Sequence, residues 1–166
     1  MWNPLSRLLV GAMKYKNKKL FGLFLFAGCV LLSYWLWLSM RPVEIVAIHQ
    51  ENNYSDILVN NFPFTDKGKI DWWLKNKDMF KEKYGIPKPD SDGYFTVSFW
   101  GFGDGYVETD GYDRLCFSDM EPPLNCINKN SLMFVKNGKN TGMSFWVDGG
   151  IYRVKENGKM VKSDYD

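Results

Sequence analysis

An uncharged run of 21 residues, Leu20 to Met40, decides where the rest of this chain can reside. A helix rises 1.5 Å per residue, so the run reaches about 31 Å, close to the ~30 Å hydrocarbon thickness of a bilayer. A cleavable export signal has a shorter apolar core followed by small residues, whereas this run closes with YWLWL at 34–38. Aromatic rings favour the headgroup level of a membrane. We therefore predict an uncleaved transmembrane helix over residues 20–40.

A lipoprotein signal is the alternative interpretation of the same run. The segment LFAGC at 25–29 resembles a lipobox, because small residues precede Cys29 and lysines precede the apolar core. Cleavage there would leave Val30 to Met40 at the mature N-terminus, and these residues are mostly apolar where lipoproteins carry a polar tether. The sequence favours the retained helix, with acylation at Cys29 as the alternative.

The basic residues beside the run predict its orientation. Four lysines lie between positions 14 and 19, against the single Arg41 after the run, and segments rich in Lys and Arg stay in the cytoplasm. We expect residues 1–19 to be a basic cytoplasmic N-terminus and residues 41–166 to form a domain on the far side of the membrane, which in a Gram-negative cell would be a periplasmic domain. Two interpretations of residues 1–12 stay open, a translation start at Met13 or a short interfacial helix with Trp2, Leu5, Leu8 and Leu9.

The exported part contains two cysteines, Cys116 and Cys126. Disulfides persist in oxidising compartments, and the intervening segment is polar and proline-bearing, as in a closed loop. We expect the two residues to pair. A ring of this size stabilises a fold by roughly 2 to 3 kcal/mol in the chain-entropy model. A redox-active pair would instead favour Cys-x-x-Cys spacing.

Hydrophobic periodicity predicts one helix among several strands in residues 41–166. A helix capped by Thr65 or Asp66 and ended by Gly85 gathers apolar side chains on one face, namely Ile70, Trp73, Leu74, Phe80 and Tyr84. β-Branched and aromatic runs predict strands at 43–48, 57–59, 94–100, 112–117, 132–135, 143–147 and 151–154, and Asn157-Gly158 predicts a hairpin turn. The fold class is α+β, with one amphipathic helix against a small, mostly antiparallel sheet.

Residues with catalytic or metal-binding chemistry are sparse. We expect His49, the one histidine, to be a solvated residue at a strand end, because no zinc or nucleophile spacing includes it. The glycine-rich GFGDG at 101–105 predicts a β connection, since no helix pattern follows it to direct amides at a phosphate. We predict no catalytic residue, no metal and no cofactor.

One dense group of carboxylates is the basis of a rival hypothesis. Asp104, Glu108, Asp110 and Asp113 could coordinate calcium or supply a general acid and base. Their spacing matches no EF-hand loop, and turn chemistry accounts for Asp110-Gly111 without a ligand.

Adjacent aromatic residues cannot all face one core. Trp73 shares the apolar face of the predicted helix, so we expect Trp72 to face outward. Exposed aromatics among charges suggest protein recognition, against which core filling and membrane-surface contact compete. The partner-binding candidates are Trp72, Trp100, Phe102 and Tyr106. Nucleic acid is an unexpected partner, because residues 41–166 carry all 19 acids and 16 of the 21 Lys and Arg, a net charge of −3.

The segments FPFTDKGKI at 62–70 and KEKYGIPKP at 81–89, with MRPVEIVAIHQ at 40–50, carry a resemblance. The chain resembles a family of enterobacterial membrane proteins catalogued as a domain of unknown function, number nine-four-three. The resemblance implies a bacterial inner-membrane protein and gives no activity or site residues.

Our leading functional hypothesis is a non-enzymatic protein whose disulfide-bonded periplasmic domain binds a periplasmic or membrane protein. Its narrower form is an immunity protein against an envelope-acting toxin, by architectural analogy with colicin M immunity protein. The rival is an envelope enzyme or calcium-binding module that uses the four carboxylates.

Overall fold

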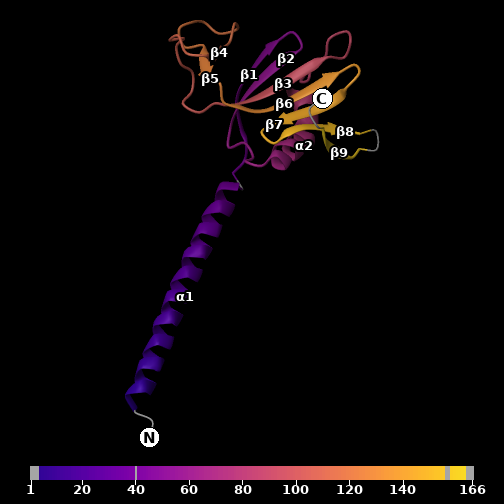
Figure 1. Ribbon diagram of the computed structural model, residues 1–166. Helices are drawn as coiled ribbons and strands as arrows, with labels where there is room; N and C mark the ends of the chain where they lie inside the picture. Colours follow the sequence, from indigo (N-terminus) through magenta and orange to yellow (C-terminus); the bar gives the residue numbers. More distant parts are fainter. Residues whose placement is uncertain (1–3, 40, 156–157, 164–166) are drawn as a thin grey trace. The chain divides into compact units, whose positions relative to one another are not determined.

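The computed structural model describes residues 4–39, 41–155 and 158–163, with side chains from 18–37, 41–155 and 158–163. The chain divides into two compact units, Met1–Arg41 and Pro42–Asp166 (Figure 1). Asn157 of the predicted hairpin turn lies outside the described residues, as do the side chains of residues 1–17, on which the two interpretations of the N-terminus depend.

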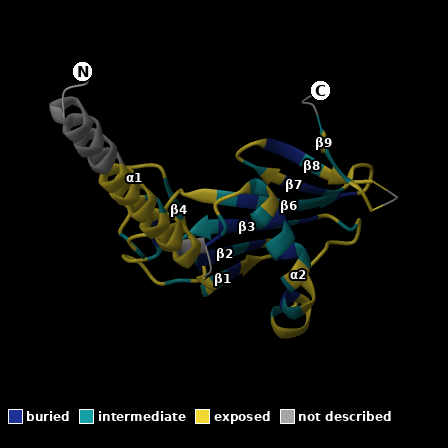
Figure 2. Cartoon of the chain, turned by 90° about the horizontal axis from the view of Figure 1, so that it is seen from below, coloured by how far each residue is buried: buried dark blue, intermediate teal, exposed yellow. Residues whose placement is uncertain are grey.

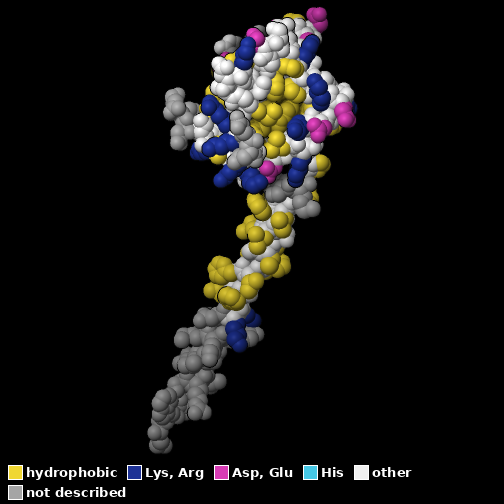
Figure 3. All heavy atoms as spheres, turned by 90° about the vertical axis from the view of Figure 1, so that its right-hand side faces the viewer, with side chains coloured by type: hydrophobic (Ala, Val, Ile, Leu, Met, Phe, Trp, Pro, Cys, Tyr) yellow, Lys and Arg dark blue, Asp and Glu magenta, His cyan; other side chains and the backbone are white. Residues whose placement is uncertain are grey.

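The first unit is one long helix, α1 (Pro4–Ser39). Its segment Lys18–Trp37 is long and apolar enough to cross a membrane by length and composition. Figure 3 shows apolar side chains along the described part of α1 and basic side chains at one end of it. The described large apolar side chains of this segment are exposed, among them Phe24 at 69% and Leu31 at 68%. A helix that is apolar on all sides matches lipid surroundings better than the single stripe of a surface helix.

The second unit is built on a seven-stranded sheet in the order β1-β2-β3-β6-β7-β8-β9. The strands are β1 (Glu44–Glu51), β2 (Tyr54–Asn60), β3 (Phe95–Gly101), β6 (Ser131–Gly138), β7 (Gly142–Val147), β8 (Gly150–Val154) and β9 (Met160–Ser163). Every pair of neighbours is antiparallel except β2 and β3, which are parallel and are joined through α2 (Asp66–Tyr84). The predicted α+β class with a mostly antiparallel sheet is confirmed.

Helix α2 begins and ends where the sequence indicates. The Thr65 side chain accepts a hydrogen bond from the Gly68 amide at 3.1 Å, which satisfies one of the free N–H groups of the first turn. Gly85 follows the last turn with φ of 67°, and its amide donates to the carbonyl of Lys81. Glycine adopts this left-handed conformation without the steric cost of a Cβ atom.

The main core lies between α2 and one face of the sheet. Trp73 and Phe80 of the helix are buried against Val97 and Phe99 of β3 and Val135 of β6. Figure 2 shows the buried residues concentrated in the middle strands of the sheet. Trp73 is therefore a core residue, as its helical position predicts.

Trp72 differs from our expectation. It is half-buried, and its ring packs against Phe62, Phe80 and Phe99 with centroid distances of 5.3, 5.9 and 5.9 Å. The indole is long enough to lie along the side of the helix and reach the same core as its neighbour. Our prediction that Trp72 faces outward was wrong.

A second, smaller core lies on the opposite face of the sheet. There the segment between β3 and β6 folds over β1 to β3 and forms a hairpin of β4 (Arg114–Cys116) and β5 (Cys126–Asn128). Phe117 and Ile127 from this segment are buried with Leu58 of β2. The sequence predicted β4 within the longer run at 112–117 but not β5, whose three residues have no such run around them.

Candidate functional site

His49 lies on β1 and faces the segment that folds over the sheet. Its exposed fraction is 8%, so the expectation of a solvated histidine was wrong. The Nδ1 atom is 2.8 and 2.9 Å from the two carboxylate oxygens of Asp119, and Nε2 is 2.8 Å from the Tyr106 hydroxyl. A neutral ring with its proton on Nδ1 donates to Asp119 and accepts from Tyr106, which satisfies both nitrogens.

Aromatic rings enclose this histidine. The Phe117 ring stacks on the imidazole at 3.8 Å and an interplanar angle of 11°, and Tyr106 meets it edge-on. Burial raises the pKa of Tyr106 above its ordinary value of 10.0, and the negative charge of Asp119 raises it further. A phenol held neutral in this way is a hydrogen-bond donor rather than a nucleophile. We define His49, Tyr106, Phe117 and Asp119 as the histidine clip.

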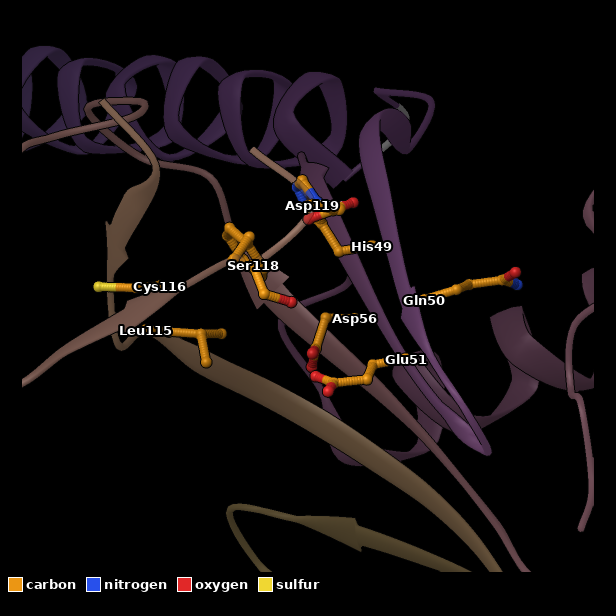
Figure 4. A pocket seen from close by; sticks show the side chains of 9 residues that line it. His49, Gln50, Glu51, Asp56, Leu115, Cys116, Ser118 and Asp119 are labelled. Atoms are coloured by element: carbon orange, nitrogen blue, oxygen red, sulfur yellow. Dashed lines mark hydrogen bonds and ion pairs between the residues drawn. The ribbon is translucent and has the colours of Figure 1, made fainter. Parts of the chain in front are cut away.

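A small polar pocket of about 130 Å³ opens beside the clip (Figure 4). Glu51, Asp56 and Asp119 supply its carboxylates, and Ser118 supplies a hydroxyl. The close-up shows the Glu51 and Asp56 side chains directed toward each other from the paired strands β1 and β2. Asp56 also accepts a hydrogen bond of 2.7 Å from the Trp100 indole, so this carboxylate also helps to hold Trp100 in place.

The disulfide closes the loop that carries two residues of the histidine clip. Cys116 and Cys126 are joined, with an S–S distance of 2.15 Å, as the sequence predicted. The closed loop carries both Phe117 and Asp119, and Cys116 lines the pocket. Cross-linking the two ends of this loop restricts how far Phe117 and Asp119 can move from His49.

Two of the four acids of the rival hypothesis, Asp110 and Asp113, form separate ion pairs. Asp110 forms an ion pair of 2.6 Å with Arg114, and the hydrogen bond from this guanidinium is the main reason that the pKa of Asp110 is lowered. The same pairing raises the pKa of Arg114. Asp113 pairs with Lys129. Among the residues that the structure describes, His, Cys, Asp and Glu form no group of three or more that could hold a metal ion.

The remaining aromatic candidates lie together in the second core. Trp100, Phe102 and Tyr106 are half-buried and pack against Leu58, Phe117 and Ile127. Their role in partner binding stays a prediction. Phe102 and Tyr106 meet at 5.2 Å with an interplanar angle of 77°.

Trp100 continues into an aromatic row that leads out to solvent. Its ring meets Phe134 of β6 at 5.6 Å, and Phe134 pairs across the strands with Trp146 of β7, which is 38% exposed. The Lys136 ammonium lies 4.1 Å from the centroid of the Trp146 ring. We call Trp100, Phe134, Lys136 and Trp146 the aromatic row. Side chains alternate between the two faces of β7, so Phe145 is buried and Trp146 is exposed. This alternation is visible in the sequence MSFWV, but our candidate residues did not include Trp146.

A groove marks the end of the sheet where β2 and β3 finish. It encloses about 460 Å³ and is lined by Phe62, Pro63, Phe64 and Leu132, among others. Lys69, only 4% exposed, reaches it from α2 and binds the Asp148 carboxylate at 2.7 Å and the Leu132 carbonyl at 3.0 Å. A buried lysine among the polar positions of a helix has no sequence signal, because its partners lie 79 and 63 positions away.

Comparison with known proteins places the chain in a family. The family model described as "Enterobacterial putative membrane protein (DUF943)" matches residues 14–164. The chain belongs to this family. No curated protein and no solved structure matches it. DUF943 membership agrees with the apolar helix α1 and confirms the resemblance carried by the FPFTDKGKI and KEKYGIPKP segments.

Proposed function

We propose that this DUF943 protein is a single-pass inner-membrane protein whose periplasmic domain binds another protein without catalysing a reaction. The proposal has two parts, the placement of the domain and the surface that binds. Four lysines before the span and one arginine after it support a cytoplasmic N-terminus. The disulfide supports export, because such bonds persist in oxidising compartments.

The aromatic row is the observation that carries the binding part. Tryptophan and tyrosine are enriched at the centres of protein interfaces, where they combine a large apolar area with few rotatable bonds. The described outward positions of β6, β7 and β8 include the cations Lys136 and Arg153 and no acid. Charge complementarity therefore favours a partner that presents acidic side chains around an apolar patch.

Photo-crosslinking in cells tests the binding surface. A photoreactive amino acid placed at Arg153, which is exposed and faces the same side as Trp146, reports a neighbouring partner as a shifted band. Truncating an interface tryptophan commonly costs 2 kcal/mol or more, about thirtyfold in affinity. Trp146→Ala should therefore strongly weaken the band, whereas Tyr112→Ala, at another exposed aromatic, should leave it unchanged. Equal bands in the two variants would refute the assignment of this surface.

Reporter fusions test the placement. Alkaline phosphatase fused after residue 163 should be active, because that enzyme folds in the periplasm, and intact mass should show that no acyl chain is attached at Cys29. A mature N-terminus at Cys29 with acyl chains would replace the anchor with a lipoprotein. An inactive phosphatase fusion would place the domain in the cytoplasm.

The immunity hypothesis is the narrower form of this proposal. It rests on the architecture alone, an N-terminal anchor joined to a small disulfide-bonded domain. A toxin gene directly upstream, together with sensitivity of a deletion strain to that toxin, would support it. An envelope-biosynthesis operon at the same place would favour the rival envelope enzyme.

A further inference from the structure

The loop between β2 and α2 presents one phenylalanine to solvent. Phe62 points inward and is 8% exposed, with its ring 5.1 Å from Phe99, whereas Phe64 is 76% exposed. Burial of a phenylalanine side chain is favourable, and Phe64 lacks most of this stabilisation in the isolated domain.

The backbone holds Phe64 in this position. Asn61 has a φ of 56°, a left-handed conformation that turns the chain out of β2, and Thr65 caps α2 directly after Phe64. Between these two fixed points lies Pro63, whose ring sets its own φ angle. The loop is short and conformationally restricted, so the Phe64 side chain is held in solvent and cannot readily turn back onto the domain.

Lys67 lies on the first turn of α2, three residues after Phe64. Its side chain is 84% exposed and forms an i,i+4 ion pair with Asp71. An aromatic ring with a neighbouring lysine is a common arrangement at membrane surfaces, where the ring enters the headgroup region and the ammonium meets anionic lipid.

Phe64 lies at the end of the domain where the chain enters from α1. Glu44, the first residue of β1, pairs with Asn60, the last residue of β2, and the loop with Phe64 begins at the next residue. Four residues, 40–43, connect Ser39 with Glu44. Five residue steps span at most about 18 Å, so Glu44 stays within this covalent reach of the last residue of α1 in any orientation of the domain.

We propose that the loop 61–65, with Phe64 at its tip and Lys67 beside it, docks on the lipid surface from which the chain emerges. The inference rests on the proposed function in one respect, that α1 spans the membrane. Lipid is favoured over a protein occupant because the tether keeps this end of the domain near the bilayer at every moment, at an effective concentration that no freely diffusing partner has. Docking at this end leaves the aromatic row on the sheet face available to a protein.

Spin labels on the full-length chain test the docking. The protein is reconstituted in vesicles of phosphatidylcholine with a minority of phosphatidylglycerol, in a Cys29→Ala background that keeps the disulfide. A nitroxide is attached through Phe64→Cys, through Tyr112→Cys as an exposed aromatic control, or through Leu31→Cys within α1. Collisions with oxygen, which partitions into lipid, are compared with collisions with a water-soluble nickel chelate.

We expect the oxygen-to-nickel ratio at position 64 to exceed that at position 112 severalfold and to approach that at position 31. A water-like ratio at 64 with a lipid-like ratio at 31 would overturn the docking and leave the membrane span intact. A water-like ratio at 31 would overturn the span and the docking together. Low access to both reagents at 64 would show that protein rather than lipid covers the loop and would also overturn lipid docking.

A second variant keeps the test independent of the label at position 64. A nitroxide attached through Lys67→Cys should show an intermediate ratio that falls to the value of position 112 when Phe64→Ser is added. An unchanged ratio at position 67 in the Phe64→Ser variant would show that the phenylalanine does not hold the loop at the lipid surface.

Discussion

Replacing Tyr106 with phenylalanine isolates one hydrogen bond of the histidine clip. The change removes the hydroxyl that lies 2.8 Å from His49 Nε2 and keeps the ring that contacts Phe102 and Phe117. His49 is 8% exposed, so its Nε2 atom loses its partner where water has little access. Leaving a buried acceptor unsatisfied costs about 1 to 3 kcal/mol in the free energy of unfolding.

The assay is thermal unfolding of the full-length chain in detergent, followed by near-ultraviolet circular dichroism of the domain. For a domain of about 125 residues, 1 kcal/mol shifts the Tm by roughly 3 to 5 °C. We therefore expect Tyr106→Phe to lower the Tm by about 3 to 15 °C. The matched control is Tyr112→Phe, at a tyrosine that is 75% exposed, which should stay within about 0.5 kcal/mol of the parent.

A double-mutant cycle shows whether the clip acts as a unit. Asp119→Asn keeps an acceptor for His49 Nδ1 but removes the charge, and both changes act on the same imidazole. Groups that share a partner typically show coupling energies of 0.5 to 3 kcal/mol. Strictly additive losses, or a Tyr106→Phe shift no larger than that of Tyr112→Phe, would refute the reasoning.

Three further predictions concern single measurements. The pKa of Tyr106 in the folded protein lies above 10.0. The stability that depends on its neutral hydroxyl is therefore fully present below pH 10.0 and is lost as the pH rises through the folded-state pKa. The difference in tyrosinate absorbance between the parent and Tyr106→Phe measures this pKa. Trp73→Ala should lower the free energy of unfolding by roughly 3 to 5 kcal/mol, and Trp72→Ala by about 0.5 to 3 kcal/mol, as measured by denaturant titration. Replacing Cys116 and Cys126 together with alanine should cost roughly 2 to 3 kcal/mol, and intact mass with and without reductant should show the bond in the parent protein.

Local signals account for what the sequence predicted well. Thr65 and Gly85 mark the ends of α2 through capping chemistry that involves neighbours within a few residues. The position of Trp73 follows from a 3.6-residue period, and each predicted strand overlaps an observed one. The parallel β2–β3 pair was not predicted, although the predicted order of strand, helix and strand is the arrangement in which a crossover helix joins two parallel strands.

The site was less predictable, since its contacts join distant parts of the chain. His49 meets Tyr106 and Asp119 at separations of 57 and 70 positions, and both partners lie in irregular segments without a hydrophobic period. Trp72 was misplaced for a different reason. Helical periodicity gives the direction of the Cα–Cβ bond, whereas a large indole can turn back toward the core from the flank of the helix.

The position of β3 between β2 and β6 has a consequence for the order in which the domain assembles. Within the sheet, β1–β2 and β6 to β9 are antiparallel neighbours in sequence, so each set can form from local contacts alone. Strand β3 is bonded to β2 at Tyr54–Thr96, 42 positions apart, and to β6 at Trp100–Ser131, 31 positions apart. Forming either pair costs loop-closure entropy before apolar side chains are buried. Strand β3 therefore joins two parts of the sheet that can form first, β1–β2 and β6 to β9. Its amide hydrogens should exchange with solvent only through global unfolding, whereas those of β8 and β9 should exchange through smaller local openings.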